Sequence, residues 1–192
     1  MRKFFLILSI LLALPAKALE PPKFDTFLPE FRYLYRVYHL GPRLNAKDVD
    51  LIAVRIWHGS GEDYMIASIS ACQGIFETHY NRSIQHNGHK GDIGMRNFTI
   101  LAEAKRLGLI KSKKDIWILN YCERNPAFAD KLAASRLAYL IGLYGSIQRT
   151  LFQYVRGNGW MEDTPKGKKD FKDCVSYYNG VMKLREAVFN GR

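Results

Sequence analysis

The sequence is poor in cysteine, has fewer acidic than basic residues and lacks internal repeats and low-complexity tracts. The three cysteines Cys72, Cys122 and Cys174 are too few for a disulfide-dense scaffold. In an oxidising compartment they permit one bridge and one leftover thiol, and the sequence does not select the pair. The longest apolar run, residues 4–14, is shorter than the roughly 20 residues that a membrane-spanning helix needs. We therefore expect neither a disulfide scaffold nor a stable membrane span.

The N-terminal residues have the pattern of an export signal. A basic start, Met1-Arg2-Lys3, precedes the apolar run, and Ala16-Lys17-Ala18 supplies small residues at a cleavage site. The pattern predicts a signal peptide over residues 1–18 and a single mature domain over residues 19–192. The protein is accordingly expected to be exported, periplasmic or secreted, and to need no cofactor.

The charge balance is basic. The chain has 29 lysines and arginines against 18 acidic residues, and three of the basic ones lie in the predicted signal peptide. The mature domain keeps 26 basic residues, a net charge of +8 with neutral histidines. This charge favours an anionic partner. Nucleic acid is one candidate, but export favours a polymer of the bacterial envelope.

Apolar residues recur at helical spacing along most of the chain. We expect helices over residues 46–58, 62–77 and 98–107, after Ser112, from Asn125-Pro126 to Tyr144, over 146–155, and at the C-terminus. The period disappears between Thr78 and Asn97, where asparagines and glycines gather. The predicted fold is mostly α (α+β), with a short β-hairpin or ordered loop after the helix that ends near Glu77.

Glu77 is the first candidate for chemistry. It ends a segment whose expected apolar stripe consists of Met65, Ile69, Cys72 and Phe76. A carboxyl at the edge of an apolar face can have its pKa raised by desolvation, as a general acid needs. Asp92, in Asp92-Ile93-Gly94, is a candidate second carboxylate, and the alternative is an Asx-turn residue that shapes the loop.

Other polar and aromatic clusters are weaker candidates. His79, His86 and His89 do not have the spacing of a zinc site, so no metal is expected. The aromatic run around Phe31, Tyr33, Tyr35 and Tyr38 is interpreted as core or as a strip covering a cleft.

These motifs together resemble a known family. Glu77-Thr78, Asn87-Gly88 and Gly94-Met95-Arg96-Asn97 look like the Glu-Ser … Gly-Leu-Met-Gln pattern of the soluble lytic transglycosylases in the lysozyme-like superfamily. The Asn-Gly pair is similar to small secretion-system and invasion-associated transglycosylases. Downstream, the helix ending in Tyr144-Gly145 and the segment Tyr154-Val155-Arg156-Gly157 extend the resemblance.

The resemblance implies roles for individual residues. Glu77 resembles the catalytic acid/base and Thr78 its hydroxyl neighbour, while Met95, Asn97 and Tyr154 resemble residues that contact the glycan. Two positions depart from the pattern. Arg96 places a charge where an apolar residue is usual, and Val155 replaces an asparagine.

The function implied is cleavage of the β-1,4 bond between N-acetylmuramic acid (MurNAc) and N-acetylglucosamine (GlcNAc) in peptidoglycan. Glu77 would act as general acid/base and leave a 1,6-anhydro product. Two alternatives stay open, a lysozyme-type hydrolase and a non-catalytic envelope protein that binds peptidoglycan. The expected partners are peptidoglycan strands, with an envelope-spanning secretion or assembly machine as a further one and no nucleic acid.

Overall fold

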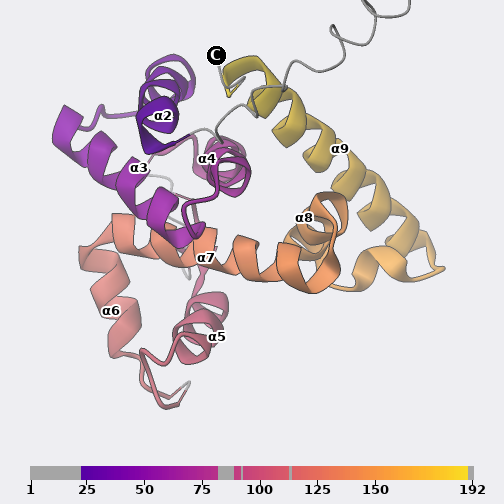
Figure 1. Ribbon diagram of the computed structural model, residues 1–192. Helices are drawn as coiled ribbons and strands as arrows, with labels where there is room; N and C mark the ends of the chain where they lie inside the picture. Colours follow the sequence, from indigo (N-terminus) through magenta and orange to yellow (C-terminus); the bar gives the residue numbers. More distant parts are fainter. Residues whose placement is uncertain (1–22, 82–88, 92, 113, 190–192) are drawn as a thin grey trace, which may run out of the picture.

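Helices make up most of the described chain. The computed structural model describes residues 23–81, 89–91, 93–112 and 114–189, which contain eight α-helices (Figure 1). The helices are α2 (Phe24–Tyr38), α3 (Ala46–Gly59), α4 (Tyr64–Thr78), α5 (Asn97–Arg106), α6 (Trp117–Arg124), α7 (Pro126–Tyr144), α8 (Ile147–Arg156) and α9 (Pro165–Val188). A 3-10 turn, η2, spans Gly159–Met161. The mostly α prediction is confirmed, and the predicted signal peptide lies outside the described residues.

The ends of several helices follow from local sequence signals. Asn45 caps α3 by accepting a hydrogen bond from the Asp48 backbone N–H at 2.9 Å. Pro126 opens α7, where its missing N–H costs nothing. Gly145 ends the same helix with φ +62°, a left-handed conformation that glycine adopts without a Cβ clash. These signals account for boundaries that the sequence placed within one or two residues.

Helix α4 is the centre of the fold. It contacts α2, α3, α7 and α9, and it is buried on nearly every side. The predicted one-sided stripe is therefore wrong: Ile69 and Cys72 are fully buried, but Met65 and Phe76 are exposed. A helix surrounded by neighbours is apolar all round, so periodicity does not reveal which face matters.

The N-terminal aromatic run belongs to helix α2. Phe31 and Tyr35 lie one helical turn apart and are buried, whereas Tyr33 is exposed. Phe31 meets the ring of Tyr80 edge-on, with 5.5 Å between ring centroids. The run is thus core on one side only, which agrees with the core interpretation and not with a strip over the cleft described below.

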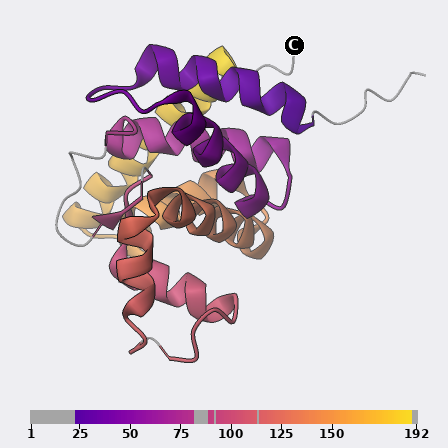
Figure 2. The ribbon, with the colours of Figure 1, turned by 90° about the vertical axis from the view of Figure 1, so that its left-hand side faces the viewer.

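Helix α7 divides the molecule. Figures 1 and 2 show α2, α3 and α4 on one side of it and α5 and α6 on the other, with α8 and α9 near its C-terminal end. A buried carboxylate joins α5 to α7: Glu103 accepts a hydrogen bond from the Ser135 hydroxyl at 2.7 Å and pairs with Arg106. In the described residues no helix combines the length and apolar character that crossing a membrane requires.

Two short strands lie between α4 and α5. β1 (His89–Lys90) and β2 (Met95–Arg96) pair antiparallel, with His89 opposite Arg96 and Lys90 opposite Met95. The pair lies in the segment where a short hairpin or ordered loop was predicted. It places β2 and the first turn of α5 against α7.

The three cysteines are all buried and none is bonded to another. Burial raises the pKa of the Cys72 thiol, and it raises that of Cys122 to about 12. Such thiols stay protonated and behave as small apolar core residues. The bridge that the sequence permitted is absent.

Candidate functional site

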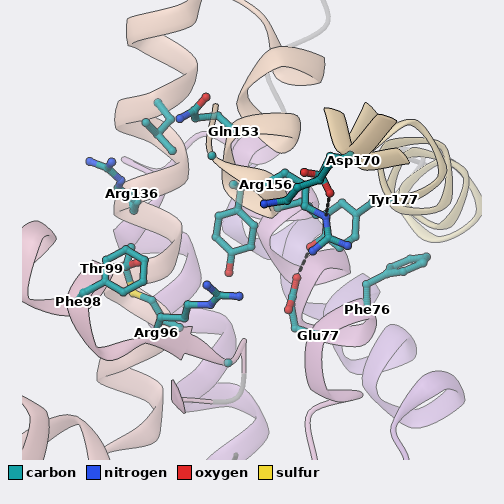
Figure 3. Close-up of a pocket in the computed structure, with 17 residues that line it drawn as sticks. Phe76, Glu77, Arg96, Phe98, Thr99, Arg136, Gln153, Arg156, Asp170 and Tyr177 are labelled. Carbon is teal, nitrogen blue, oxygen red and sulfur yellow. Dashed lines mark hydrogen bonds and ion pairs between the residues drawn. The ribbon is translucent and has the colours of Figure 1, made fainter. Parts of the chain in front are cut away.

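A cleft of about 790 Å³ opens between the end of α4, the β2–α5 segment and helices α8 and α9 (Figure 3). Its polar lining residues are Glu77, Arg96, Thr99, Arg136, Gln153, Tyr154, Arg156, Lys166, Asp170 and Tyr177. Its other lining residues are Phe76, Gly94, Met95, Phe98, Leu140, Val155 and Gly157. The cleft therefore gathers segments that the sequence separates by up to 100 residues.

Glu77 lies in the last turn of α4, and its exposed side chain points into the cleft (Figure 3). The Tyr177 hydroxyl, from α9, donates a hydrogen bond to Glu77 Oε1 at 2.8 Å. We call the end of α4 together with the facing part of α9 the Glu77 wall. This contact fixes the orientation of the carboxyl group without removing it from the cleft.

Tyr177 is itself held by a buried amide. Gln73, one turn before Glu77 on α4, donates from Nε2 to the Tyr177 hydroxyl oxygen at 3.5 Å. Burial and the neighbouring Glu77 charge raise the pKa of Tyr177 well above its ordinary value. The phenol is therefore protonated at neutral pH and serves as a hydrogen-bond donor to the carboxylate.

Packing around Phe76 completes this wall. The Phe76 ring meets Tyr177 at 5.8 Å between centroids. A Cβ added at Gly180 of α9 would lie 2.7 Å from the Phe76 ring, so the glycine makes room for it. Arg185 of α9 also donates from Nε to the Ser68 hydroxyl at 2.7 Å. Helix α9 is thus docked on α4 by both apolar and polar contacts.

Thr78 lies behind the cleft and is not among the lining residues. Its hydroxyl donates to the Gly74 carbonyl at 3.2 Å and accepts from the Tyr80 backbone N–H at 3.1 Å. The chain leaves α4 through two left-handed residues, His79 (φ +52°) and Tyr80 (φ +54°). Tyr80 is buried and donates from its hydroxyl to the Ala71 carbonyl at 2.8 Å. These contacts hold a turn that is unfavourable for side-chain-bearing residues.

The facing side of the cleft, the Arg96 wall, consists of β2 and the first turn of α5. Met95 is buried and lines the cleft, and Arg96 is exposed and points into it (Figure 3). Asn97 begins α5 and is half-buried, but it does not line the cleft. Asp92, the candidate second carboxylate, lies outside the described residues.

A buried carboxylate that the sequence analysis missed holds this wall. Asp130 of α7 is fully buried and accepts a hydrogen bond from the Ile93 backbone N–H at 2.8 Å. A Cβ added at Gly91 (φ +77°) would lie 2.8 Å from the same carboxylate oxygen. The turn between β1 and β2 is thus fitted around Asp130. Asp130 lies on the predicted α7 helix, and its burial was the signal that periodicity did not reveal.

Tyr154 of α8 lies between the two walls and lines the cleft (Figure 3). Burial raises the pKa of its phenol, the Glu77 charge raises it further, and Arg96 acts in the opposite direction. Both charges therefore act on the same hydroxyl. Val155 also lines the cleft, at the position where the family motif has an asparagine.

The second described carboxylate of the lining is already paired. Asp170 of α9 forms an ion pair with Arg156 Nε at 3.4 Å, and Arg156 also contacts Asp173 at 3.0 Å (Figure 3). Among the residues that the structure describes, no group of three or more His, Cys, Asp or Glu side chains is placed to hold a metal ion.

The structure therefore brings Glu77, Met95 and Tyr154 to one cleft and leaves Thr78 and Asn97 outside its lining. Sequence reasoning missed Tyr177, Gln73 and Asp130. Gln73 shares the α4 face of Glu77 at i and i+4 spacing, a signal that was readable. Tyr177 had none, because it meets Glu77 only through tertiary packing.

Comparison with protein-family models, with curated protein sequences and with solved structures finds no match for this chain. The function proposed below rests on the cleft and on the motif residues.

Proposed function

We propose that the protein is an exported lytic transglycosylase that cleaves the β-1,4 bond between MurNAc and GlcNAc in peptidoglycan, with Glu77 as its general acid/base. The observation that carries the proposal is the position of Glu77. Its carboxyl group ends a central helix, points into a large cleft and is oriented by the Tyr177 hydroxyl at 2.8 Å. A similarity of motif order, from Glu77 to Tyr154, supports the same assignment.

Glu77 would first act as an acid. Its carboxylic proton passes to the glycosidic oxygen as the bond from the MurNAc C1 atom to that oxygen breaks. The GlcNAc unit leaves with a hydroxyl group, and Glu77 becomes a carboxylate.

Glu77 would then act as a base. It accepts the proton of the MurNAc 6-hydroxyl, whose oxygen bonds to C1 and closes the 1,6-anhydro ring. The carboxylic acid is regenerated, so one group serves both steps. Tyr177 keeps the carboxyl in one orientation throughout, because its own proton stays on at neutral pH.

The pairing of the other lining carboxylate favours this one-carboxylate mechanism over a lysozyme-type hydrolase. A hydrolase of that type uses a second carboxylate as nucleophile or as a base for water. Among the described lining residues the only other carboxylate is Asp170, and it is engaged by Arg156. The product end group distinguishes the two reactions.

The test is digestion of purified peptidoglycan by the wild type and by Glu77→Gln, with muropeptides identified by mass spectrometry. Anhydro ends are expected from the wild type and no release from Glu77→Gln. Glu186→Gln is the matched control, because Glu186 is an exposed glutamate of α9 outside the cleft. Reducing ends would assign the protein to the hydrolases. Binding without release by the wild type would assign it to non-catalytic peptidoglycan-binding proteins.

A further inference from the structure

The described lining of the cleft carries an excess of positive charge. Arg96, Arg136, Arg156 and Lys166 face two carboxylates, Glu77 and Asp170. Arg156 is neutralised by its contacts with two aspartates of α9. The remaining cations outnumber Glu77, which makes the cleft attractive to an anionic ligand.

Arg96 is the cation nearest to the proposed chemistry. It faces Glu77 across the cleft, and Tyr154 lies between them (Figure 3). The charges of Glu77 and Arg96 both act on the Tyr154 hydroxyl, in opposite directions. A sugar bound beside Glu77 would therefore also lie beside the guanidinium group.

Arg96 has no acidic partner among the described residues, and its side chain is exposed to the cleft. The Arg136 guanidinium, by contrast, lies over the Tyr139 ring at 5.3 Å. The Arg96 fork of N–H donors is thus available to a ligand, and such a fork matches a carboxylate bidentately. Its backbone is set by the β1–β2 pair and by Asp130.

We propose that Arg96 is a specificity-determining residue that binds a carboxylate on the glycan strand beside the bond that Glu77 cleaves. This inference rests on the proposed function and names the substrate class more narrowly: acidic strands in preference to neutral ones. The carboxylate has two possible sources, the lactyl group of peptide-free muramic acid and the free carboxylates of the stem peptide. A neutral chitin-type strand offers neither.

The test compares the binding of three glycans of equal length to Glu77→Gln, which binds without cleaving. The probes are a strand with stem peptides, a strand stripped by an amidase so that its lactyl carboxylates are free, and a chitooligosaccharide. Both acidic strands, or one of them, are expected to bind about tenfold more tightly than the neutral one. The acidic strand whose affinity depends on Arg96 identifies the source of the carboxylate.

Adding Arg96→Gln is expected to abolish this preference and to leave chitooligosaccharide binding within about twofold, while Arg96→Lys retains part of it. Arg43→Gln is the matched control, because Arg43 is an exposed arginine outside the cleft lining. An equal change for all three glycans would overturn the inference.

Cleavage assays with Glu77 intact separate the two proposals. Cleavage by the wild type with a preference unaltered by Arg96→Gln overturns the role of Arg96 alone. An Arg96-dependent preference in binding without any cleavage overturns the enzymatic function and supports the carboxylate site.

Discussion

The two walls of the cleft are held in different ways. On the Glu77 wall, long helices pack through apolar side chains, and a single string of hydrogen bonds from Gln73 through Tyr177 reaches the carboxyl group. On the Arg96 wall, a two-residue strand and the start of α5 are tied to α7 by the buried carboxylates Asp130 and Glu103. The first wall depends on helix packing and the second on buried polar contacts, so their variants should fail differently.

The largest expected difference between the walls is in the rate of peptidoglycan cleavage. Glu77→Gln removes the acid/base and should lower kcat by a factor of about 10² to 10⁴. Arg96→Gln removes a binding contact and should act mainly through KM on acidic strands. Steady-state kinetics on one soluble peptidoglycan preparation measures both. Comparable losses of kcat in the two variants would contradict the division of labour.

The next largest effect concerns stability of the Arg96 wall. Asp130→Ala leaves the buried Ile93 N–H without its acceptor, which should cost about 1 to 3 kcal/mol in the free energy of unfolding. Asp63→Ala is the control, because Asp63 accepts the Ile66 N–H as an exposed cap of α4 and its loss should cost about 1 kcal/mol. Urea denaturation measures both. A smaller loss at Asp130 than at Asp63 would show that the wall does not depend on this carboxylate.

A smaller effect is expected from the string of hydrogen bonds on the Glu77 wall. Tyr177→Phe keeps the ring that packs on Phe76 but removes the donor to Glu77, so cleavage should slow about tenfold with a nearly unchanged Tm. Tyr178→Phe, at the neighbouring half-buried tyrosine, should leave the rate unchanged. If both variants cleave at the wild-type rate, Tyr177 does not orient the carboxyl group.

The smallest effect is a dependence of stability on alkaline pH. The folded protein keeps the protons of Tyr154 and Tyr177 at pH values where the unfolded chain, with an ordinary pKa near 10, loses them. The folded state then binds more protons, so the free energy of unfolding falls as pH rises above about 10.

Removing one of the two phenols should make that fall shallower. Urea denaturation of the wild type and Tyr177→Phe at pH 9 and 11 should show a loss smaller by about 1 kcal/mol in the variant. The comparison between variants cancels the contribution of lysines, which titrate in the same range. Parallel curves would indicate that Tyr177 ionises in the folded protein as it does in the unfolded chain.

Local signals in the sequence predicted a large part of the fold. Caps and stops such as Asn45, Pro126 and Gly145 act within one turn of the chain, so they could be read without knowing the neighbours. The stripe assigned to α4 was wrong because the environment of a central helix is decided by four other helices. The core role of Phe31 and Tyr35 was among the alternatives, but the helix that contains them was not predicted.

The site was predictable only where a single residue carries the signal. Glu77, Met95 and Tyr154 line the cleft as motif residues, whereas Thr78 is occupied by the end of its own helix. Asp130 and Tyr177 could not be identified, because their importance arises from burial and from contact with residues distant along the chain.

The contact between Glu77 and Tyr177 spans 100 positions of sequence, and α9 is the last helix that the structure describes. During synthesis and export the carboxyl group would emerge long before the helix that orients it. Any partly folded chain without a docked α9 would also lack one side of the cleft, to which Asp170 and Tyr177 belong. The order of the chain thus acts as a timer: cutting capacity arises only at the final folding step, after the polypeptide has been delivered to its polymer.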